Sequence, residues 1–100
     1  MNNLTICVIY KARGKGEREK YVSELKSSGV LDAILSENGC LAYEYFYSDK
    51  DENTLVLFEK WENSECQKIH MTMNHMKTAF EIKDKYIESA TLRRLDISEF

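Results

Sequence analysis

The sequence predicts an α+β fold of the ferredoxin-like kind, β-α-β-β-α-β, with a four-stranded antiparallel sheet covered by helices on one face. One observation predicts this fold, and a second predicts that it is confined to one domain. Four short segments rich in β-branched and aromatic residues alternate with two stretches of helical periodicity, in that order along the chain. The chain has 100 residues and no proline, repeat or linker-like tract, which predicts a single domain over residues 1–100.

The first half of the chain supplies one strand and one helical stretch. Residues 4–11 (LTICVIYK) are β-branched and aromatic, which favours a strand. Apolar residues then recur at helical spacing over residues 17–35, with charged residues between them. Gly29 is expected to kink or split this helix because glycine is a poor helix former. The Asn38-Gly39 pair ends it, since glycine suits the left-handed cap.

The second half supplies three strands and the second helical stretch. Residues 40–47 (CLAYEYFY) and 54–61 (TLVLFEKW) are expected to form a hairpin around the polar cluster SDKDEN. Residues 64–86 follow as a helical stretch, and residues 90–97 (ATLRRLDI) close the sheet as its fourth strand.

Two start signals divide the second helical stretch. Asn63 or Ser64 can cap its beginning, a contribution of about 1 kcal/mol. Asn74 is a second start signal, which predicts two short helices that meet near Met73.

The predicted strands are apolar on both faces. Leu55 and Leu57 alternate with Val56 and Phe58, whereas an antiparallel sheet with one solvated face would alternate apolar and polar residues. A second copy of the same sheet is the simplest cover for the face without helices, which predicts a homodimer. Three tyrosines share one face of the second strand and are expected in this interface: Tyr43, Tyr45 and Tyr47.

Composition excludes several classes of partner. The formal charge of −3 provides no broad attraction to nucleic acid or anionic lipid. No stretch approaches the roughly 20 apolar residues of a membrane span, and no signal-peptide pattern is present. The three cysteines are widely spaced and odd in number, which favours buried thiols over disulfides. A cytoplasmic location is therefore expected, with no membrane and no nucleic-acid partner.

The candidate site residues begin at the end of the third strand. Glu59 and Trp61 share a face of that strand, where a carboxylate is costly to bury unless a partner stabilises it. Glu59 therefore either makes a structural hydrogen bond or serves a pocket. Trp61 either fills the core and donates its indole N–H or contacts a ligand.

The two histidines, His70 and His75, are the candidate acid–base groups. Their spacing of five does not place them on one helical face, so they are not the i, i+4 pair of zinc metalloproteases. A helix break at Asn74 would let both approach one cavity. Cys66 and His70 have the i, i+4 spacing, but two ligands are too few, and no metal site is predicted. Each histidine could equally be a structural residue on a helix.

Several of these residues together resemble the antibiotic biosynthesis monooxygenase family of dimeric α+β barrels. The resemblance rests on residues 37–43 (ENGCLAY), residues 59–61 (EKW), His70 and the pair His75-Met76, in this order and spacing. It implies a ferredoxin-like fold, a dimer formed by packed sheets and a cavity between sheet and helices. Some members oxidise quinols and polycyclic phenols with molecular oxygen and need neither metal nor flavin.

The resemblance thus implies a cofactor-independent monooxygenase acting on a small quinol or polyphenol. His70 would be the base, His75 or Trp61 would orient substrate or donate to oxygen, and Glu59 would fix a neighbouring donor. Haem-degrading members share an asparagine in the first strand and a tryptophan in the later helix, and both are absent here.

Two alternatives stay open. One is an isomerase of a small phosphorylated signal molecule, which needs cations near the cavity, the candidates being Lys11, Arg13, Arg93 and Arg94. The other is a non-catalytic dimer that binds a small molecule or haem.

Overall fold

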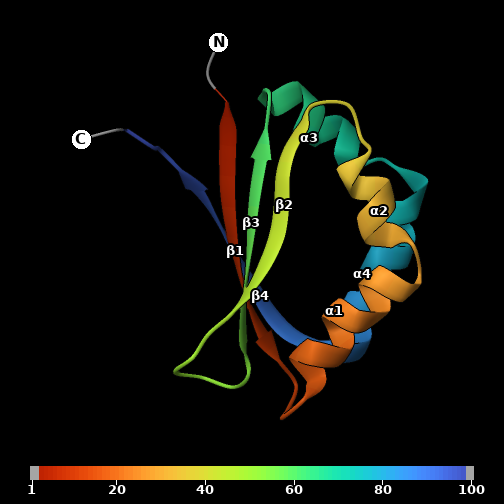
Figure 1. Cartoon of the computed structure of the whole chain (residues 1–100), viewed down its shortest axis with the longest axis vertical. Helices are drawn as coiled ribbons and strands as arrows, with labels where there is room; N and C mark the ends of the chain where they lie inside the picture. The colour runs from red at the N-terminus through yellow and green to blue at the C-terminus, as the bar shows by residue number, and fades with distance from the viewer. Residues whose placement is uncertain (1–2, 99–100) are drawn as a thin grey trace.

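The computed structural model describes residues 3–98 and confirms the predicted α+β, ferredoxin-like fold. Strands and helices follow one another as β-α-α-β-β-α-α-β, each predicted helical stretch being divided in two (Figure 1). The elements are β1 (Leu4–Ala12), α1 (Glu17–Ser27), α2 (Val30–Leu35), β2 (Cys40–Tyr47), β3 (Thr54–Trp61), α3 (Ser64–His70), α4 (Asn74–Tyr86) and β4 (Ile87–Leu95).

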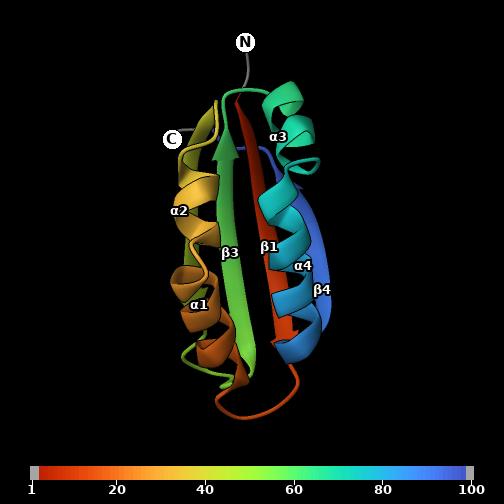
Figure 2. The same cartoon turned by 90° about the vertical axis from the view of Figure 1, so that its right-hand side faces the viewer.

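The four strands form one sheet in the order β2-β3-β1-β4, and every neighbouring pair is antiparallel. All four helices lie over the same face of this sheet, as Figures 1 and 2 show from two directions. In both views the opposite face is covered by no helix or strand of residues 3–98. No helix within residues 3–98 has both the length and the apolar character to cross a membrane.

Local signals explain the helix boundaries. Gly29 adopts φ 84°, a left-handed backbone conformation that residues with a Cβ rarely adopt, and it separates α1 from α2. Asn63 caps α3, its side chain accepting the backbone N–H of Cys66 at 2.9 Å. A second helix begins at Asn74, directly after Met73. The predicted division of both helical stretches is therefore confirmed.

The prediction for the last strand was wrong at both ends, because β4 runs from Ile87 to Leu95 and not over residues 90–97. The chain passes from α4 into β4 without a loop, and Ile87 is both the C-cap of the helix and the first strand residue. Ile87 is buried and pairs with Ala12, where the register of β1 and β4 shifts. Apolar patterning does not show such a direct junction.

The helix-covered face of the sheet forms the core. Leu55, Leu57 and Trp61 of β3 are almost inaccessible to solvent, at 0 to 1% exposure, and pack against buried residues of β1 and the helices. The uncovered face is also apolar at its centre. There Phe46, Val56 and Ile9 lie side by side across three strands, and Phe46 and Ile9 are exposed.

The expectation for the tyrosines was wrong for all three. Tyr43 pairs with Glu59, Tyr45 with Leu57 and Tyr47 with Leu55, so all three share the helix-covered face with those buried residues. Tyr47 lies at the edge of that face, exposed in part, with the guanidinium of Arg18 from α1 4.9 Å from its ring centroid. A register shift between Cys40 and Ala42 leaves the residue between them unpaired and exposed, so alternation counted from the start of β2 is misleading.

The expectation of buried thiols holds for one cysteine of three. Cys66 is buried, whereas Cys7 and Cys40 are half-buried, and all three are free thiols.

Candidate active site

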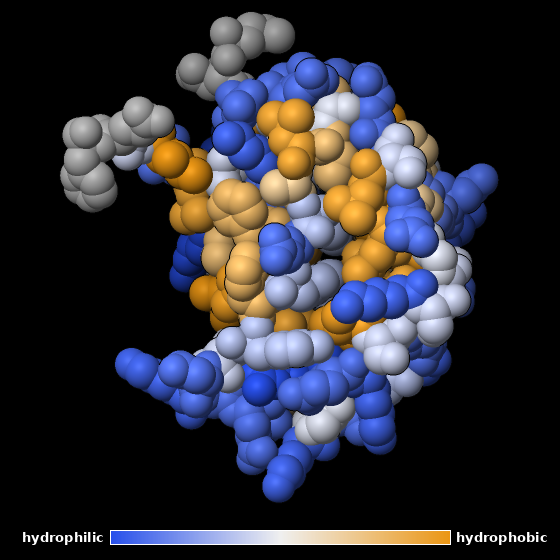
Figure 3. Space-filling view, in the orientation of Figure 1, coloured by the Kyte–Doolittle hydropathy of each residue, from blue (hydrophilic) through white to orange (hydrophobic). Residues whose placement is uncertain are grey.

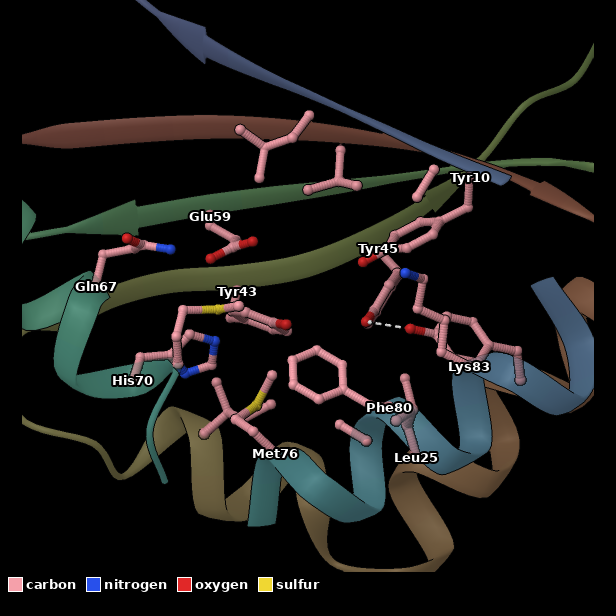
Figure 4. Close-up of a pocket in the computed structure, with 17 residues that line it drawn as sticks. Tyr10, Leu25, Tyr43, Tyr45, Glu59, Gln67, His70, Met76, Phe80 and Lys83 are labelled. Atoms are coloured by element: carbon pink, nitrogen blue, oxygen red, sulfur yellow. Dashed lines mark hydrogen bonds between the residues drawn. The ribbon is translucent and has the colours of Figure 1, made fainter. Parts of the chain in front are cut away.

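A cavity of about 270 Å³ lies between the sheet and the helices. Its walls come from all four strands of the sheet, from α1 and α2 on one side and from α3 and α4 on the other (Figure 4). Most lining side chains are apolar or aromatic, and the ionisable ones other than tyrosine are Glu59, His70 and Lys83. A cavity of this size and lining suits a small aromatic ligand.

The cavity opens to solvent between β4 and the second pair of helices. Leu92 of β4, Met71 after α3 and Phe80 of α4 line it and are exposed at the same time. The space-filling view shows this hollow, bordered by apolar side chains (Figure 3). A planar apolar molecule could therefore enter without unfolding any element.

Four tyrosines make one side of the cavity polar: Tyr10, Tyr21, Tyr43 and Tyr45. The hydroxyls of Tyr21 and Tyr45 lie 3.4 Å apart, and their rings meet edge to face at 5.8 Å between centroids. Burial raises the pKa of all four phenols, of Tyr10, Tyr43 and Tyr45 by most. These phenols therefore stay protonated and act as hydrogen-bond donors over the neutral range.

Glu59 extends from β3 into the cavity and is 6% exposed. The indole N–H of Trp61, two residues on, donates to its Oε1 at 2.9 Å. Burial raises the pKa of the Glu59 carboxyl above its ordinary value of 4.5, and the bond from Trp61 offsets part of this rise. Trp61 itself is fully buried behind the carboxyl and is not among the described residues that line the cavity.

His70, the last residue of α3, is held at the end of the cavity nearest Glu59 (Figure 4). Its ring packs against Trp61 at 4.7 Å and against Tyr43 at 5.7 Å between centroids, and only 1% of the residue is exposed. Its Nδ1 lies 2.8 Å from Oε2 of Glu37. One ring nitrogen is thus engaged, and Nε2 is the nitrogen available to a ligand in the cavity.

Glu37, in the loop after α2, joins both histidines. Its Oε2 lies 2.8 Å from Nδ1 of His70 and 2.7 Å from Nε2 of His75, the second residue of α4. An ionised carboxylate only accepts hydrogen bonds, so each imidazole must present an N–H to it. A neutral His70 then carries its proton on Nδ1 and has a free lone pair on Nε2.

The structure thus places the sequence-predicted residues in two groups. His70 and Glu59 line the cavity. Trp61 donates to Glu59 from outside the lining, and His75, also outside it, contacts Glu37. Glu37 was not predicted as a site residue from the sequence, and it lies 33 residues before His70 and 38 before His75. The signal available for it was its position directly before the Asn38-Gly39 turn, in one of the segments that carry the family resemblance.

The cations considered for phosphate binding lie elsewhere. Lys11 pairs with Asp51, and Arg13 donates to the backbone carbonyl of Asp84. Neither these two nor Arg93 and Arg94 are among the described residues that line the cavity. Within residues 3–98, Lys83 is the only lysine or arginine that lines the cavity, so the structure does not favour the phosphorylated-substrate alternative.

Comparisons with known proteins agree with this architecture. The sequence pattern of the family described as "Antibiotic biosynthesis monooxygenase" matches residues 5–82. A protein of Bacillus subtilis strain 168 named "Putative monooxygenase YcnE" is 33% identical over 85 residues, which are 83% of this chain and 86% of that protein.

Solved structures share the fold at lower identity. The crystal structure of PA3566 from Pseudomonas aeruginosa has a TM-score of 0.82 at 18% identity, covering 99% of this chain and 97% of that one. A structure from Nitrosomonas europaea, titled "Putative antibiotic biosynthesis monooxygenase", has a TM-score of 0.79 at 15% identity, covering 93% of this chain and 88% of that one. At these identities the similarity shows the fold alone.

Proposed function

Because this chain belongs to the antibiotic biosynthesis monooxygenase family, we propose that it is a cofactor-independent monooxygenase that oxidises a small quinol or polyphenol with molecular oxygen. The observation that carries the proposal is the arrangement of His70. Its Nδ1 is bound by a buried carboxylate, and its other nitrogen is available to a cavity lined by aromatic side chains. A histidine held in this tautomer is a suitable general base for a phenolic hydroxyl.

The reaction begins with proton transfer, because a phenolate or quinol anion gives up an electron to oxygen more readily than the neutral molecule. Nε2 of His70 takes the proton from the hydroxyl. The substrate anion then transfers one electron to O₂, and the resulting substrate radical and superoxide combine to form a C–O bond at a ring carbon. The product of this step is a ring peroxide.

The second half of the reaction breaks the O–O bond. The proton on the peroxide-bearing carbon passes to the outer oxygen of the peroxide anion as the C=O bond forms, and hydroxide is expelled. The hydroxide takes the proton that His70 had accepted and leaves as water. A quinol and O₂ thus give a hydroxyquinone and water. One oxygen atom enters the substrate, and the substrate itself supplies all four electrons, which is why no redox cofactor is required.

The other cavity groups stabilise the negative charge that develops on oxygen. The four tyrosines of the cavity offer protonated hydroxyls. Because burial raises its pKa, Glu59 is the carboxyl in this cavity that can also donate a proton in a hydrogen bond. Trp61 positions Glu59, and Glu37 positions His70 and stabilises its protonated form. His75 is assigned to the same positioning role through Glu37.

A homodimer is part of the proposal. The exposed row of Phe46, Val56 and Ile9 on the uncovered face is apolar and crosses the middle of the sheet, where a second copy of the same face would cover it. Sedimentation at micromolar concentration should give twice the chain mass of 11.7 kDa. Ile9→Glu should shift it to the single-chain mass, and a wild-type protein that sediments as a single chain would contradict the dimer.

The test of the reaction is oxygen uptake with a panel of quinols and polyphenols, measured with a chelator present. His70→Ala should lower kcat by at least about 100-fold, the lower end of general-base catalysis. Added imidazole should restore part of the rate, because the truncated side chain leaves room for it. Glu37→Gln should lower kcat by about tenfold, since the amide cannot stabilise the protonated ring by charge.

Gln67→Ala is the matched control. Gln67 lies on the same helix and lines the same cavity but cannot act as a base, so the barrier should change by less than about 1 kcal/mol. No oxygen uptake with any compound of the panel would reject the proposed reaction, and an unchanged rate in His70→Ala would reject the proposed role of His70.

A further inference from the structure

The cluster of Glu37, His70 and His75 has a second chemical capacity beyond hydrogen bonding. Two imidazole nitrogens and one carboxylate oxygen converge there, and these three atoms lie within 4.8 Å of one another. Two histidines and a carboxylate form a common donor set for zinc and other divalent transition metals. The three residues come from the loop after α2, the end of α3 and the start of α4, so this site exists only in the folded chain.

A buried carboxylate oxygen of Glu37 without a hydrogen-bond partner is a second indication of a cation site. Oε1 of Glu37 is buried and has no hydrogen-bond partner within residues 3–98, although the other oxygen of the same carboxylate has two. The side chain is only 4% exposed, so bulk water does not compensate for the missing bond. A cation bound to this carboxylate would stabilise the oxygen that the two histidines do not reach.

We propose that Glu37, His70 and His75 form a binding site for a divalent transition metal, of which Zn²⁺ is the best-suited common example. Access is through His75, whose side chain is 25% exposed, whereas the other two residues are nearly inaccessible. Zinc ligands lie about 2.0–2.2 Å from the metal and, in tetrahedral geometry, about 3.3–3.6 Å from one another. Oε2 of Glu37 lies 2.8 and 2.7 Å from the two ring nitrogens, so metal binding requires these atoms to move apart by about 0.5–0.9 Å.

The position of the site determines how a bound metal would affect the reaction. Glu37 and His75 are not among the described residues that line the cavity, so a metal between them would lie behind His70 and away from the substrate. A metal on Nδ1 of His70 displaces the proton from that nitrogen, and a neutral ring then carries it on Nε2. The nitrogen that faces the cavity becomes a donor and can no longer accept a proton. The bound metal is therefore an inhibitor of the reaction proposed above.

Binding and inhibition are tested separately, because only the inhibition depends on the proposed reaction. Chelator-treated protein is titrated with ZnCl₂ in equilibrium dialysis and with CoCl₂, whose ligand-field absorption reports nitrogen and oxygen ligation. One metal per chain is expected. His75→Gln, a change at the partly exposed ligand, should weaken the affinity by at least about tenfold while circular dichroism stays unchanged.

Cys66→Ser is the control for binding, since Cys66 is a nearby thiol on α3 that is outside the three-residue cluster. It should leave the affinity unchanged. Affinity that is equal in wild type and His75→Gln, or that is lost only in Cys66→Ser, would overturn the site. In the oxygen assay with the chelator removed, the fraction of wild-type turnover lost should follow Zn²⁺ occupancy. Binding without any such loss would overturn the inhibitory role alone.

Discussion

The two buried carboxylates on either side of His70, Glu37 and Glu59, have the same functional group but different surroundings. Glu37 receives two imidazole N–H groups on one oxygen and lies outside the cavity lining. Glu59 receives one indole N–H and faces the cavity. Burial raises the pKa of Glu59, and the hydrogen bond from Trp61 opposes that rise only in part.

This difference shows how neighbours divide one residue type between two tasks. A carboxylate that accepts from two imidazoles can fix the orientation of a base. A carboxyl with one neutral donor and an apolar cavity in front of it has a raised pKa, so it accepts a proton more readily than an ordinary carboxyl and can donate to an oxygen anion. The comparison can be tested at each carboxylate in turn.

The largest expected effect is on stability when Glu37 is truncated. Glu37→Ala removes the acceptor of two imidazoles, one of them wholly buried, and should lower the free energy of unfolding by about 3 kcal/mol. Glu59→Ala should cost less than about 1 kcal/mol, because it also removes the burden of burying a carboxyl and leaves the indole N–H of Trp61 beside the cavity. Urea denaturation at neutral pH measures both, and equal losses would contradict the comparison.

The sequence predicted the contacts of Glu59 better than those of Glu37. Glu59 and Trp61 are two residues apart in one strand, and a strand's alternation alone places them on the same face. Glu37 meets its histidines through a loop and across two helices, over 33 and 38 residues. No local periodicity encodes such a contact, and one sequence does not show which loop residue turns inward.

The same distinction holds for the fold. The division of the helices at Gly29 and Asn74 was predictable because a backbone preference and a capping residue act locally. The inward direction of Tyr43 and Tyr45 was not, because it depends on the register of β2 against β3 and on the irregularity after Cys40. Register belongs to a pair of strands and is not visible in either one alone.

An intermediate effect is expected where the backbone directs Glu37 inward. Gly39 has φ 82°, and a Cβ at this position would lie 2.4 Å from Sγ of Cys66. Gly39→Ala should therefore lower the free energy of unfolding by about 2 kcal/mol, from the left-handed backbone and the contact together. It should also reduce turnover, because the loop that carries Glu37 must shift.

Gly14→Ala is the control for that change, since a Cβ at Gly14 has no atom within 4 Å and its φ is not positive. Its unfolding free energy should stay within about 0.5 kcal/mol of wild type, as for most surface substitutions. A Gly39→Ala variant as stable and as active as Gly14→Ala would mean that the loop does not hold Glu37 in place.

The smallest expected effect concerns Glu59 and the pH dependence of the free energy of unfolding. Because burial raises the pKa of Glu59 in the folded chain, the stability linked to its protonation is complete below the ordinary value of 4.5 and is lost as pH rises through the folded pKa. Glu59→Gln cannot ionise, so its unfolding free energy should fall less than that of wild type when the pH is raised from 4.5 toward neutrality. Glu44→Gln, a change at an exposed residue of the neighbouring strand, provides the reference. Thermal or urea denaturation at closely spaced pH values measures the difference between the two variants. Parallel curves would show that the cavity does not favour the protonated carboxyl. Glu59 would then be removed as a donor to oxygen.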